Sequence, residues 1–346
     1  MKDRLDSILK AAFELGTSDI HITVGVPPVM RLNGDLKHYG KESLKPAETE
    51  GMAKSIIPPH QWQTFKEKGE LDFSYGIEGV SRFRVNAFHQ RSCISLAIRV
   101  VPTKIPSFEE LRLPPILKKA AMQQQGLILV TGPTGSGKST TLAAMIDEMN
   151  RSVRKHVITL EDPIEYLHKH GACIIDQREV GFDTKSFSDG LRACLRQDPD
   201  VILVGEMRDI ETISTAITAA ETGHLVLATL HTTDAPTTID RIIDVFPPAQ
   251  QSQVRIQLAS VLNTVISQRL LPSADKKSRV GAFEIMMNTP AVKNLIRNEK
   301  IHQIHSVMQT NKAAGMQTMQ MCVQSLLDQE KISRETAMAF LADGAL

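Results

Sequence analysis

One stretch of the sequence combines the residue types and the spacing that phosphate binding requires. The pattern Gly-x-x-x-x-Gly-Lys-Ser/Thr is filled by Gly132, Gly137, Lys138 and Ser139. Small residues in such a loop let backbone N–H groups curl around phosphate oxygens. The apolar residues 127–130 predict a buried strand before the loop, and residues 140–149 predict a helix after it. This order of strand, loop and helix predicts a site for a nucleoside triphosphate.

The same loop predicts how the nucleotide and its metal ion are held. The N-terminus of the following helix contributes the positive end of its dipole, which favours an anion. Lys138 is expected to reach the β- and γ-phosphates, and the Ser139 hydroxyl is expected to hold Mg²⁺. The residues expected to bind ATP are Gly132, Pro133, Thr134, Gly135, Ser136, Gly137, Lys138, Ser139 and Thr140.

Further polar residues follow the apolar strands that surround this loop in the sequence. Strands are expected near residues 156–160, 200–205 and 224–231, with helices between them, which is typical of a largely parallel sheet. Ligands of such sheets bind outside the carboxyl ends of the strands. The polar residues at those ends are Glu161, Asp162, Glu165, Glu206, His231 and Thr232. Carboxylates and a histidine beside a magnesium triphosphate suit metal binding and orientation of an attacking water. An ordinary charged loop is the alternative for each.

Composition limits the class of protein. The chain has 346 residues, 42% of them hydrophobic and 23% charged, which suits two soluble domains. A net charge of +1 argues against a long nucleic-acid contact. The sequence has no apolar run of membrane-spanning length, and acidic residues interrupt its first ten positions where a signal peptide would be apolar. Four scattered cysteines indicate a reducing cytosol.

The region before residue 100 is expected to form a small α/β domain. The pattern predicts an amphipathic helix over residues 5–13, a hairpin with a type I′ turn over 29–38, and a second helix near 47–57. Residues 80–88 and 94–101 alternate with period two, as adjacent strands do. In the first of these strands, Arg82 and Arg84 share one face and Phe83 and Val85 the other. An arginine-bearing sheet face is ordinarily just solvated.

The later part of the chain is divided as follows. Prolines punctuate residues 101–115, which suits a linker, and residues 116–346 are expected to form the nucleotide-binding domain. From Pro248 onward the chain is expected to be helical. One long helical face, ending before Pro272, is predicted from Val254, Leu258, Val261, Leu262 and Val265.

Four stretches together resemble the sequence boxes of the secretion-superfamily ATPases. They are residues 132–140 (Walker A), 160–165 (Asp box), 204–209 (an atypical Walker B with Gly-Glu) and 224–233 (His box). The resemblance extends from residues 18–21 through the proline-rich linker to residues 315–319, so it covers nearly the whole chain. It implies a PAS-like N-terminal domain and a RecA-like domain in a hexameric ring, with ATP between subunits.

The resemblance also implies roles for individual residues. Glu206 would activate the attacking water and help hold Mg²⁺ with Ser139, and the Asp-box acids Glu161, Asp162 and Glu165 would assist with the metal. His224 and His231 of the His box would sense the nucleotide. The arginines that match trans-acting fingers of the family are Arg84, Arg99 and Arg82.

Within this superfamily the sequence is most similar to the branch that retracts type IV pili. It lacks the four-cysteine module that extension and secretion relatives carry, and residues 291–298 resemble a motif of the retraction branch. That stretch departs from the motif at Val292, Lys293 and Asn298. The resemblance implies a cytoplasmic homohexamer at the inner face of the membrane, attached through an inner-membrane platform protein and acting on pilin indirectly.

Three alternatives stay open. The ring could drive pilus extension or type II secretion, or it could be a weakly hydrolysing paralogue that serves another motor. A RecA-like nucleic-acid motor is the third, but near-neutral charge and few aromatic residues disfavour it, because single-strand grooves combine both features.

Overall fold

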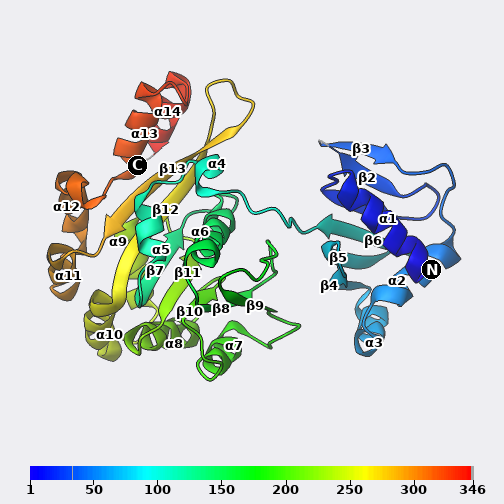
Figure 1. Ribbon diagram of the computed structural model, residues 1–346, viewed down its shortest axis with the longest axis horizontal. Coiled ribbons are helices and arrows are strands. Elements are labelled where there is room, and N and C mark those ends of the chain that lie inside the picture. The colour runs from blue at the N-terminus through cyan, green and yellow to red at the C-terminus, as the bar shows by residue number, and fades with distance from the viewer. Residues whose placement is uncertain (33, 344–346) are drawn as a thin grey trace. The chain divides into compact units, whose positions relative to one another are not determined.

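The computed structural model describes residues 1–32 and 34–343 (Figure 1). Its internal contacts divide the chain into two units. The first comprises Met1–Lys104 together with Glu165–Leu167, and the second comprises the rest of the described chain. The boundaries expected from the sequence, at residues 100 and 115, stay predictions. Within the described part of the chain, no helix is both long and apolar enough to cross a membrane.

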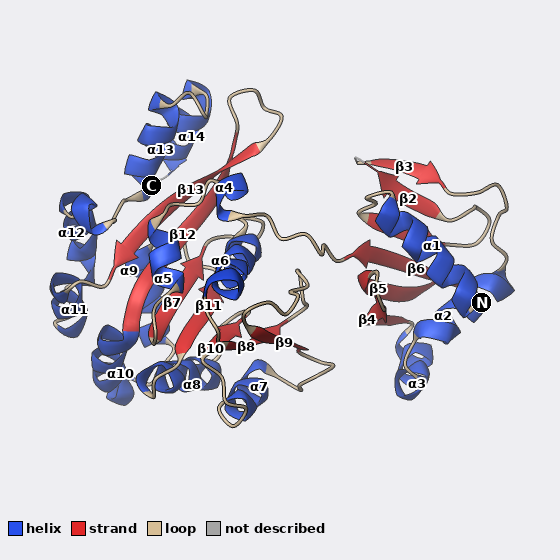
Figure 2. Cartoon of the chain, in the orientation of Figure 1, coloured by secondary structure: helices blue, strands red, loops and turns tan. Residues whose placement is uncertain are grey.

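The first unit is a six-stranded antiparallel sheet with helices packed on it (Figure 2). Its strands lie in the order β3-β2-β1-β6-β5-β4. Their bounds are β1 Asp19–Ile22, β2 Val29–Leu32, β3 Asp35–His38, β4 Glu70–Ile77, β5 Ser81–Gln90 and β6 Cys93–Val100, and the helices are α1 Lys2–Glu14, α2 Pro46–Ile56 and α3 Pro59–Lys68. The expected helices and strands are present, while α3 and β4 were not anticipated. The expected type I′ turn includes Asn33, which lies outside the described residues.

The alternation in β5 decides which face of this sheet is buried. Phe83 and Val85 are fully buried in the core of the unit, against residues of α1 and α2. Arg84 lies exposed on the opposite face, and Arg99 of β6 is its direct cross-strand neighbour. The period-two pattern therefore gave the correct orientation of the arginine-bearing face.

The second unit is built on a seven-stranded sheet in the order β13-β12-β7-β11-β10-β8-β9. Its strands are parallel except for the β12–β13 pair. The bounds are β7 Gly126–Thr131, β8 His156–Glu161, β9 Ile174–Glu179, β10 Val201–Val204, β11 Leu225–Leu230, β12 Leu262–Pro272 and β13 Arg279–Met287. Residues that follow β7, β8, β10 and β11 therefore lie at one edge of the sheet.

Helices cover both faces of this sheet, as its continuous apolar strands require. On one face, Leu127 and Leu129 of β7 pack with helices α7–α10, and on the other, Ile128 and Val130 pack with α5 and α6. The helices are α4 Phe108–Leu111, α5 Ile116–Ala121, α6 Lys138–Ser152, α7 Phe187–Cys194, α8 Ile210–Glu221, α9 Ala235–Asp244, α10 Pro248–Val261, α11 Pro290–Arg297, α12 Ile304–Thr310, α13 Met319–Asp328 and α14 Arg334–Asp343.

The expectation of continuous helix after Pro248 is wrong over residues 262–287. Helix α10 ends at Val261, and the chain continues directly into β12. Strand β12 lies between β7 and β13, so its residues from Leu262 to Ser267 are largely buried on both faces. A strand buried on both faces reads as an apolar run with no period of two, and here the spacing happened to continue the helical period of α10.

Candidate functional site

The glycine-rich loop connects β7 to α6, as the sequence predicts. Helix α6 begins at Lys138, and Gly137 before it has a φ of +89°. Gly132 has a φ of +143°, and a β-carbon there would lie 2.3 Å from the Gln268 carbonyl oxygen and 2.6 Å from Ser136 Oγ. Both the backbone conformation and the lack of space therefore require glycine at position 132.

Polar groups of the loop are arranged as an anion would need them. Lys138 Nζ donates to the carbonyl oxygens of Gly132 (2.8 Å) and Pro133 (3.1 Å), which places its charge over the loop. Ser136 Oγ is buried and has no hydrogen-bond partner among the residues that the structure describes. A buried hydroxyl in this position costs free energy unless a ligand or water bonds to it. The loop therefore fits a phosphate group.

A cavity of about 560 Å³ adjoins the C-terminal side of the loop. Gly137, Thr140 and Thr141 form one end of its lining, and Arg112, Leu270 and Phe283 lie among its other residues. Its lining combines apolar side chains with a few polar ones, as small-molecule sites do. The cavity shares Gly137 and Thr140 with the stretch that the sequence predicts to bind the nucleotide.

Glu206 lies at the carboxyl end of β10, two residues past the strand, between two basic side chains. Its Oε1 is 3.2 Å from His231 Nε2, and its Oε2 is 2.6 Å from Arg208 Nη2. The Glu206 side chain is 18% exposed, whereas Arg208 is 75% exposed. The carboxylate is thus sheltered but accessible from the edge of the sheet, where water and a nucleotide could reach it.

The pKa of Glu206 lies below its usual value through a balance of opposing causes. Partial burial raises the pKa, but the hydrogen bond and charge of Arg208 lower it, and the charges of His231 and Lys138 lower it further. Because the charge of Lys138 lowers the pKa of Glu206, the glycine-rich loop and Glu206 interact electrostatically. Glu206 is therefore an ionised carboxylate at neutral pH, as a group that orients or deprotonates water must be.

The Arg208→Ala variant is expected to raise the pKa of Glu206, because its largest favourable partner is removed. A lowered pKa keeps the carboxylate charged until the pH falls through that lowered value, so loss of Arg208 moves the acidic limb of the ATP turnover profile to higher pH. Turnover measured against pH for the variant and wild type tests this. An unchanged acidic limb would show that Arg208 does not set the ionisation of Glu206.

Glu161 and Asp162 of the Asp box lie at the end of β8, whereas Glu165 belongs to another compact unit. Glu161, the last residue of β8, accepts hydrogen bonds from Thr159 Oγ1 (2.6 Å) and Gln177 Nε2 (3.0 Å). Asp162 follows it and is exposed. Glu165 is exposed and groups with the first unit of the chain. The fold thus brings the strand ends bearing Glu161, Glu206 and His231 to one edge, whereas Glu165 belongs to a different compact unit.

His224 lies away from this edge. It precedes β11, whereas His231 follows it, so the six residues of the strand separate them. Its Nδ1 bonds with the carbonyl oxygen of Ala219 (3.0 Å) at the end of helix α8. Because β11 rises about 3.3 Å per residue, the seven steps from His224 to His231 span about 23 Å. Within one subunit it cannot touch the same nucleotide phosphates.

The arginines of the first unit border an open groove of about 270 Å³. Arg84 and Arg99 line it together with His21 and Asp72, and Arg99 Nε donates to Asp19 Oδ1 at 2.9 Å. Arg82 lies two residues before Arg84 on the same strand and is half-buried. Arg84 and Arg99 are direct cross-strand neighbours, and Asp72 and the Asp19 partner of Arg99 border the same groove, so basic and acidic side chains share this face.

Two residues of the second unit, Arg208 and Gln268, lie at the site but were not predicted from the sequence. Arg208 was recoverable, since it stands two residues after Glu206 in the same box. Gln268 was not, because it lies in β12, over which the residue spacing predicts a helix. Gln268 Oε1 accepts from Thr141 Oγ1 of α6 (2.8 Å), and its backbone lies against Gly132. The neighbouring strand β12 therefore helps to shape the phosphate loop.

Comparison with known proteins agrees with this geometry. Residues 67–344 match the family described as type II/IV secretion system protein. The chain belongs to this family. The ATPases of this family are P-loop ATPases, and so is this chain. It binds a nucleotide, which confirms the prediction drawn from the loop.

Three relatives show how close the similarity is. The chain is 47% identical to the type IV pilus retraction ATPase PilT of Pseudomonas aeruginosa, over 96% of each chain. It is 43% identical to the type IV pilus ATPase PilU of the same organism, over 98% of this chain and 89% of that one. A crystal structure of the pilus retraction motor PilT with bound ADP superposes with a TM-score of 0.88 at 50% identity, covering 96% of this chain and 95% of that one. These matches confirm the predicted fold class, an N-terminal α/β domain before a P-loop ATPase domain with a parallel-rich sheet and C-terminal helices.

Proposed function

We propose that this family member is a homohexameric, magnesium-dependent ATPase that powers type IV pilus retraction and twitching motility. The observation that carries the hydrolytic part is the position of Glu206, an ionised carboxylate 3.2 Å from His231 and within the field of Lys138. Its high identity to a retraction ATPase supports the biological role. We further propose that the protein is cytoplasmic and meets the inner membrane through a platform protein, with pilin as its indirect cargo.

The proposed mechanism assigns each residue a task at the sheet edge. Backbone N–H groups of residues 132–140 bind the phosphates, and Lys138 neutralises charge on the β- and γ-phosphates. Mg²⁺, when bound, would be held by the Ser139 hydroxyl and by Glu206, and it supplies charge stabilisation for phosphoryl transfer. Glu206 orients and activates the attacking water, and His231 beside it holds that carboxylate in place.

The remaining predicted residues are proposed to act at the metal ion or on the nucleotide of a neighbouring subunit. Glu161, Asp162 and Glu165 assist at the metal, and Arg84 and Arg99, with Arg82 as the third candidate, reach a nucleotide held by the neighbouring subunit. His224 would then report on the nucleotide of a different site from that of His231, since the two lie at opposite ends of β11. We propose no nucleic-acid partner, because the net charge of the chain is only +1.

Deleting the gene tests the direction of the motor. A strain without it is expected to carry more surface pili than wild type and to lose twitching motility, because assembled pilin is no longer withdrawn. Pili are counted by electron microscopy, and motility is scored on the same cultures. The strain complemented with wild-type protein should return to normal, and the strain complemented with Glu206→Gln should not. Bald cells would mean that this ATPase extends pili, contrary to the proposal.

An accessory role is the second candidate, favoured by 43% identity to PilU. In that case the ring would support another motor and hydrolyse ATP weakly. The purified hexamer distinguishes the two, since near-zero turnover by a well-formed ring would favour the accessory role. The complete loop and the placed Glu206 favour an active motor.

A further inference from the structure

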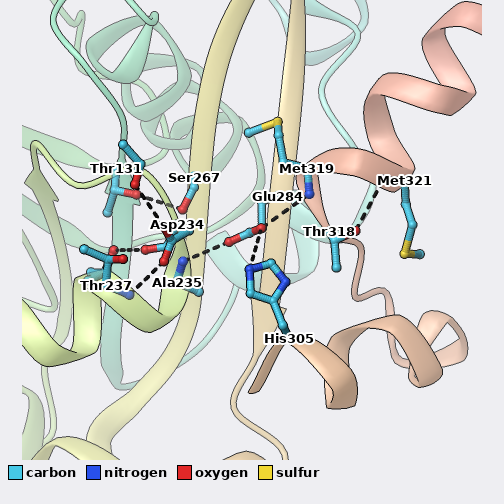
Figure 3. Close-up of polar contacts among 12 residues, drawn as sticks. Thr131, Asp234, Ala235, Thr237, Ser267, Glu284, His305, Thr318, Met319 and Met321 are labelled. Carbon is cyan, nitrogen blue, oxygen red and sulfur yellow. Dashed lines mark hydrogen bonds and ion pairs between the residues drawn. The ribbon is translucent and has the colours of Figure 1, made fainter. Parts of the chain in front are cut away.

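Glu284 is a buried carboxylate that the hydrolytic mechanism above leaves unused. It lies on β13 and is 1% exposed. Its Oε1 accepts the Ala235 N–H at 2.8 Å, and its Oε2 accepts the Met319 N–H at 3.3 Å (Figure 3). Ala235 and Met319 are the first residues of α9 and α13. One carboxylate therefore joins the N-termini of two helices that lie more than eighty residues apart in the sequence.

The N-termini of α9 and α13 both have features that stabilise a carboxylate beside them. The first turn of a helix leaves N–H groups without intrahelical partners and carries the positive end of the dipole. The N-cap residues Asp234 and Thr318 accept from Thr237 and Met321, which leaves the N–H groups of Ala235 and Met319 to Glu284. The pKa of Glu284 lies above its usual value, because burial outweighs the groups that lower it. Those groups are the Ala235 N–H, the charge of His305 at 4.0 Å and the Met319 N–H, while the nearby charge of Asp234 raises the pKa further.

A short segment connects Glu284 to the hydrolytic site. His231, which contacts Glu206, lies only four residues before Ala235. Internal hydrogen bonds stiffen the stretch between them, because Thr232 Oγ1 bonds to Thr238 Oγ1 (2.6 Å) and Thr238 Oγ1 donates to the Asp234 carbonyl (2.6 Å). Glu206 holds one end of this segment and Glu284 the other. The orientation of His231 thus depends on both carboxylates.

A second connection runs toward the phosphate loop. Ser267 of β12 is the direct cross-strand partner of Glu284, and its Oγ accepts from Thr131 Oγ1 of β7 at 2.9 Å. Thr131 is the residue before Gly132, where the loop begins. Glu284 therefore sits between the His box, the base of the phosphate loop and the C-terminal helices.

We propose that Glu284 is a positioning residue for ATP hydrolysis, which holds His231 against Glu206 through the N-terminus of α9 and ties that arrangement to α13. The inference rests on the hydrolytic part of the proposed function and not on pilus retraction. Through Met319 and His305, the C-terminal helices contact Glu284, and Glu284 is connected to Glu206 through α9 and His231. A shift of α12 or α13 would then change the geometry at Glu206.

The Glu284→Gln variant tests this, since an amide keeps the shape but turns one of the two acceptors into a donor facing a helix N–H. Turnover (kcat) is expected to fall about 10-fold or more, because small misplacements near the reacting groups have effects of that order. The KM for ATP and the affinity for a non-hydrolysable ATP analogue should stay within about 2-fold, since the phosphate loop is intact. Asp200→Asn is the matched control, because Asp200 Oδ2 also accepts a backbone N–H, that of His156, but at the opposite sheet edge.

A double mutant separates positioning from general destabilisation. If Glu284 acts through His231, Glu284→Gln should add less than about 2-fold to the loss already caused by His231→Asn. Independent losses that multiply would overturn the proposal, and so would wild-type turnover in folded Glu284→Gln. Should that variant not fold, Glu284→Asp is used in both backgrounds. It keeps the charge but shortens the reach, and full turnover in it would equally overturn the proposal.

These measurements are independent of the biological role. They use the purified full-length protein and ATP, so a strain test that refuted pilus retraction would leave them interpretable. Conversely, bald cells in the deletion strain together with the expected double-mutant result would refute only the proposed role in pilus retraction.

Discussion

The Glu206→Gln variant is expected to bind ATP normally and to lower kcat for hydrolysis by at least ~10². The amide keeps the size of the side chain and its place beside His231, but it has neither the charge nor the basicity to activate water. Because the phosphate loop is unchanged, the affinity for a non-hydrolysable ATP analogue should match that of wild type. Steady-state turnover and analogue titration of the same preparation measure the two effects separately.

A nearby acid serves as the control for this variant. Glu211 lies in the first turn of α8, is exposed, and pairs with Arg192 at the surface. Exposed ion pairs contribute little to stability, so Glu211→Gln should hydrolyse ATP at the wild-type rate. Unchanged turnover in Glu206→Gln would remove Glu206 from the hydrolytic role and leave Glu161 as the next candidate.

The Arg84→Ala variant is expected to lose about 10³-fold or more in turnover of the assembled protein, because arginine fingers contribute ~10³–10⁵ to such reactions. Arg84→Lys should recover only part of the rate, since lysine keeps the charge but lacks the planar fork that bonds two phosphate oxygens. Lys37→Ala removes an exposed charge from β3 of the same sheet and should leave ATP turnover unchanged. Turnover is measured at matched protein concentration and ring assembly.

Mixing two inactive variants tests whether Arg84 acts on a neighbouring subunit. Neither Arg84→Ala nor Glu206→Gln forms a competent site alone, but mixed rings contain interfaces with Glu206 from one subunit and Arg84 from the next. Activity should therefore return in part on mixing. If the mixture stays as inactive as its components, Arg84 does not reach across subunits.

Local patterns predicted much of the site because its parts are contiguous in the chain. The phosphate loop needs a strand, a run of small residues and a helix in direct succession, so its sequence was sufficient to place Gly132 and Lys138. The period-two pattern of β5 likewise identified the arginine-bearing face, since one buried face fixes the orientation of every side chain on a strand. Glu206 was found because polar residues that follow apolar strands collect at one sheet edge.

Other features depend on which strands become neighbours, and no local pattern reports that. Strand β12 resembled a continuation of α10, because burial on both faces removes the alternation that marks a strand. The sequence grouped His224 with His231 in one box, yet the length of β11 places them at opposite edges. Gln268 came beside the phosphate loop only through the pairing of β12 with β7.

The sequence by itself determined that this chain binds and hydrolyses a nucleotide, because that chemistry resides in short stretches whose residue types are constrained one by one. The tertiary structure alone decided which charged groups meet. His231 contacts Glu206 across the sheet edge, and Glu284 joins two distant helix N-termini through packing of β13 against α9 and α13. The physical reason is that a buried carboxylate is stable only where donors converge on it, and convergence is a property of the whole fold.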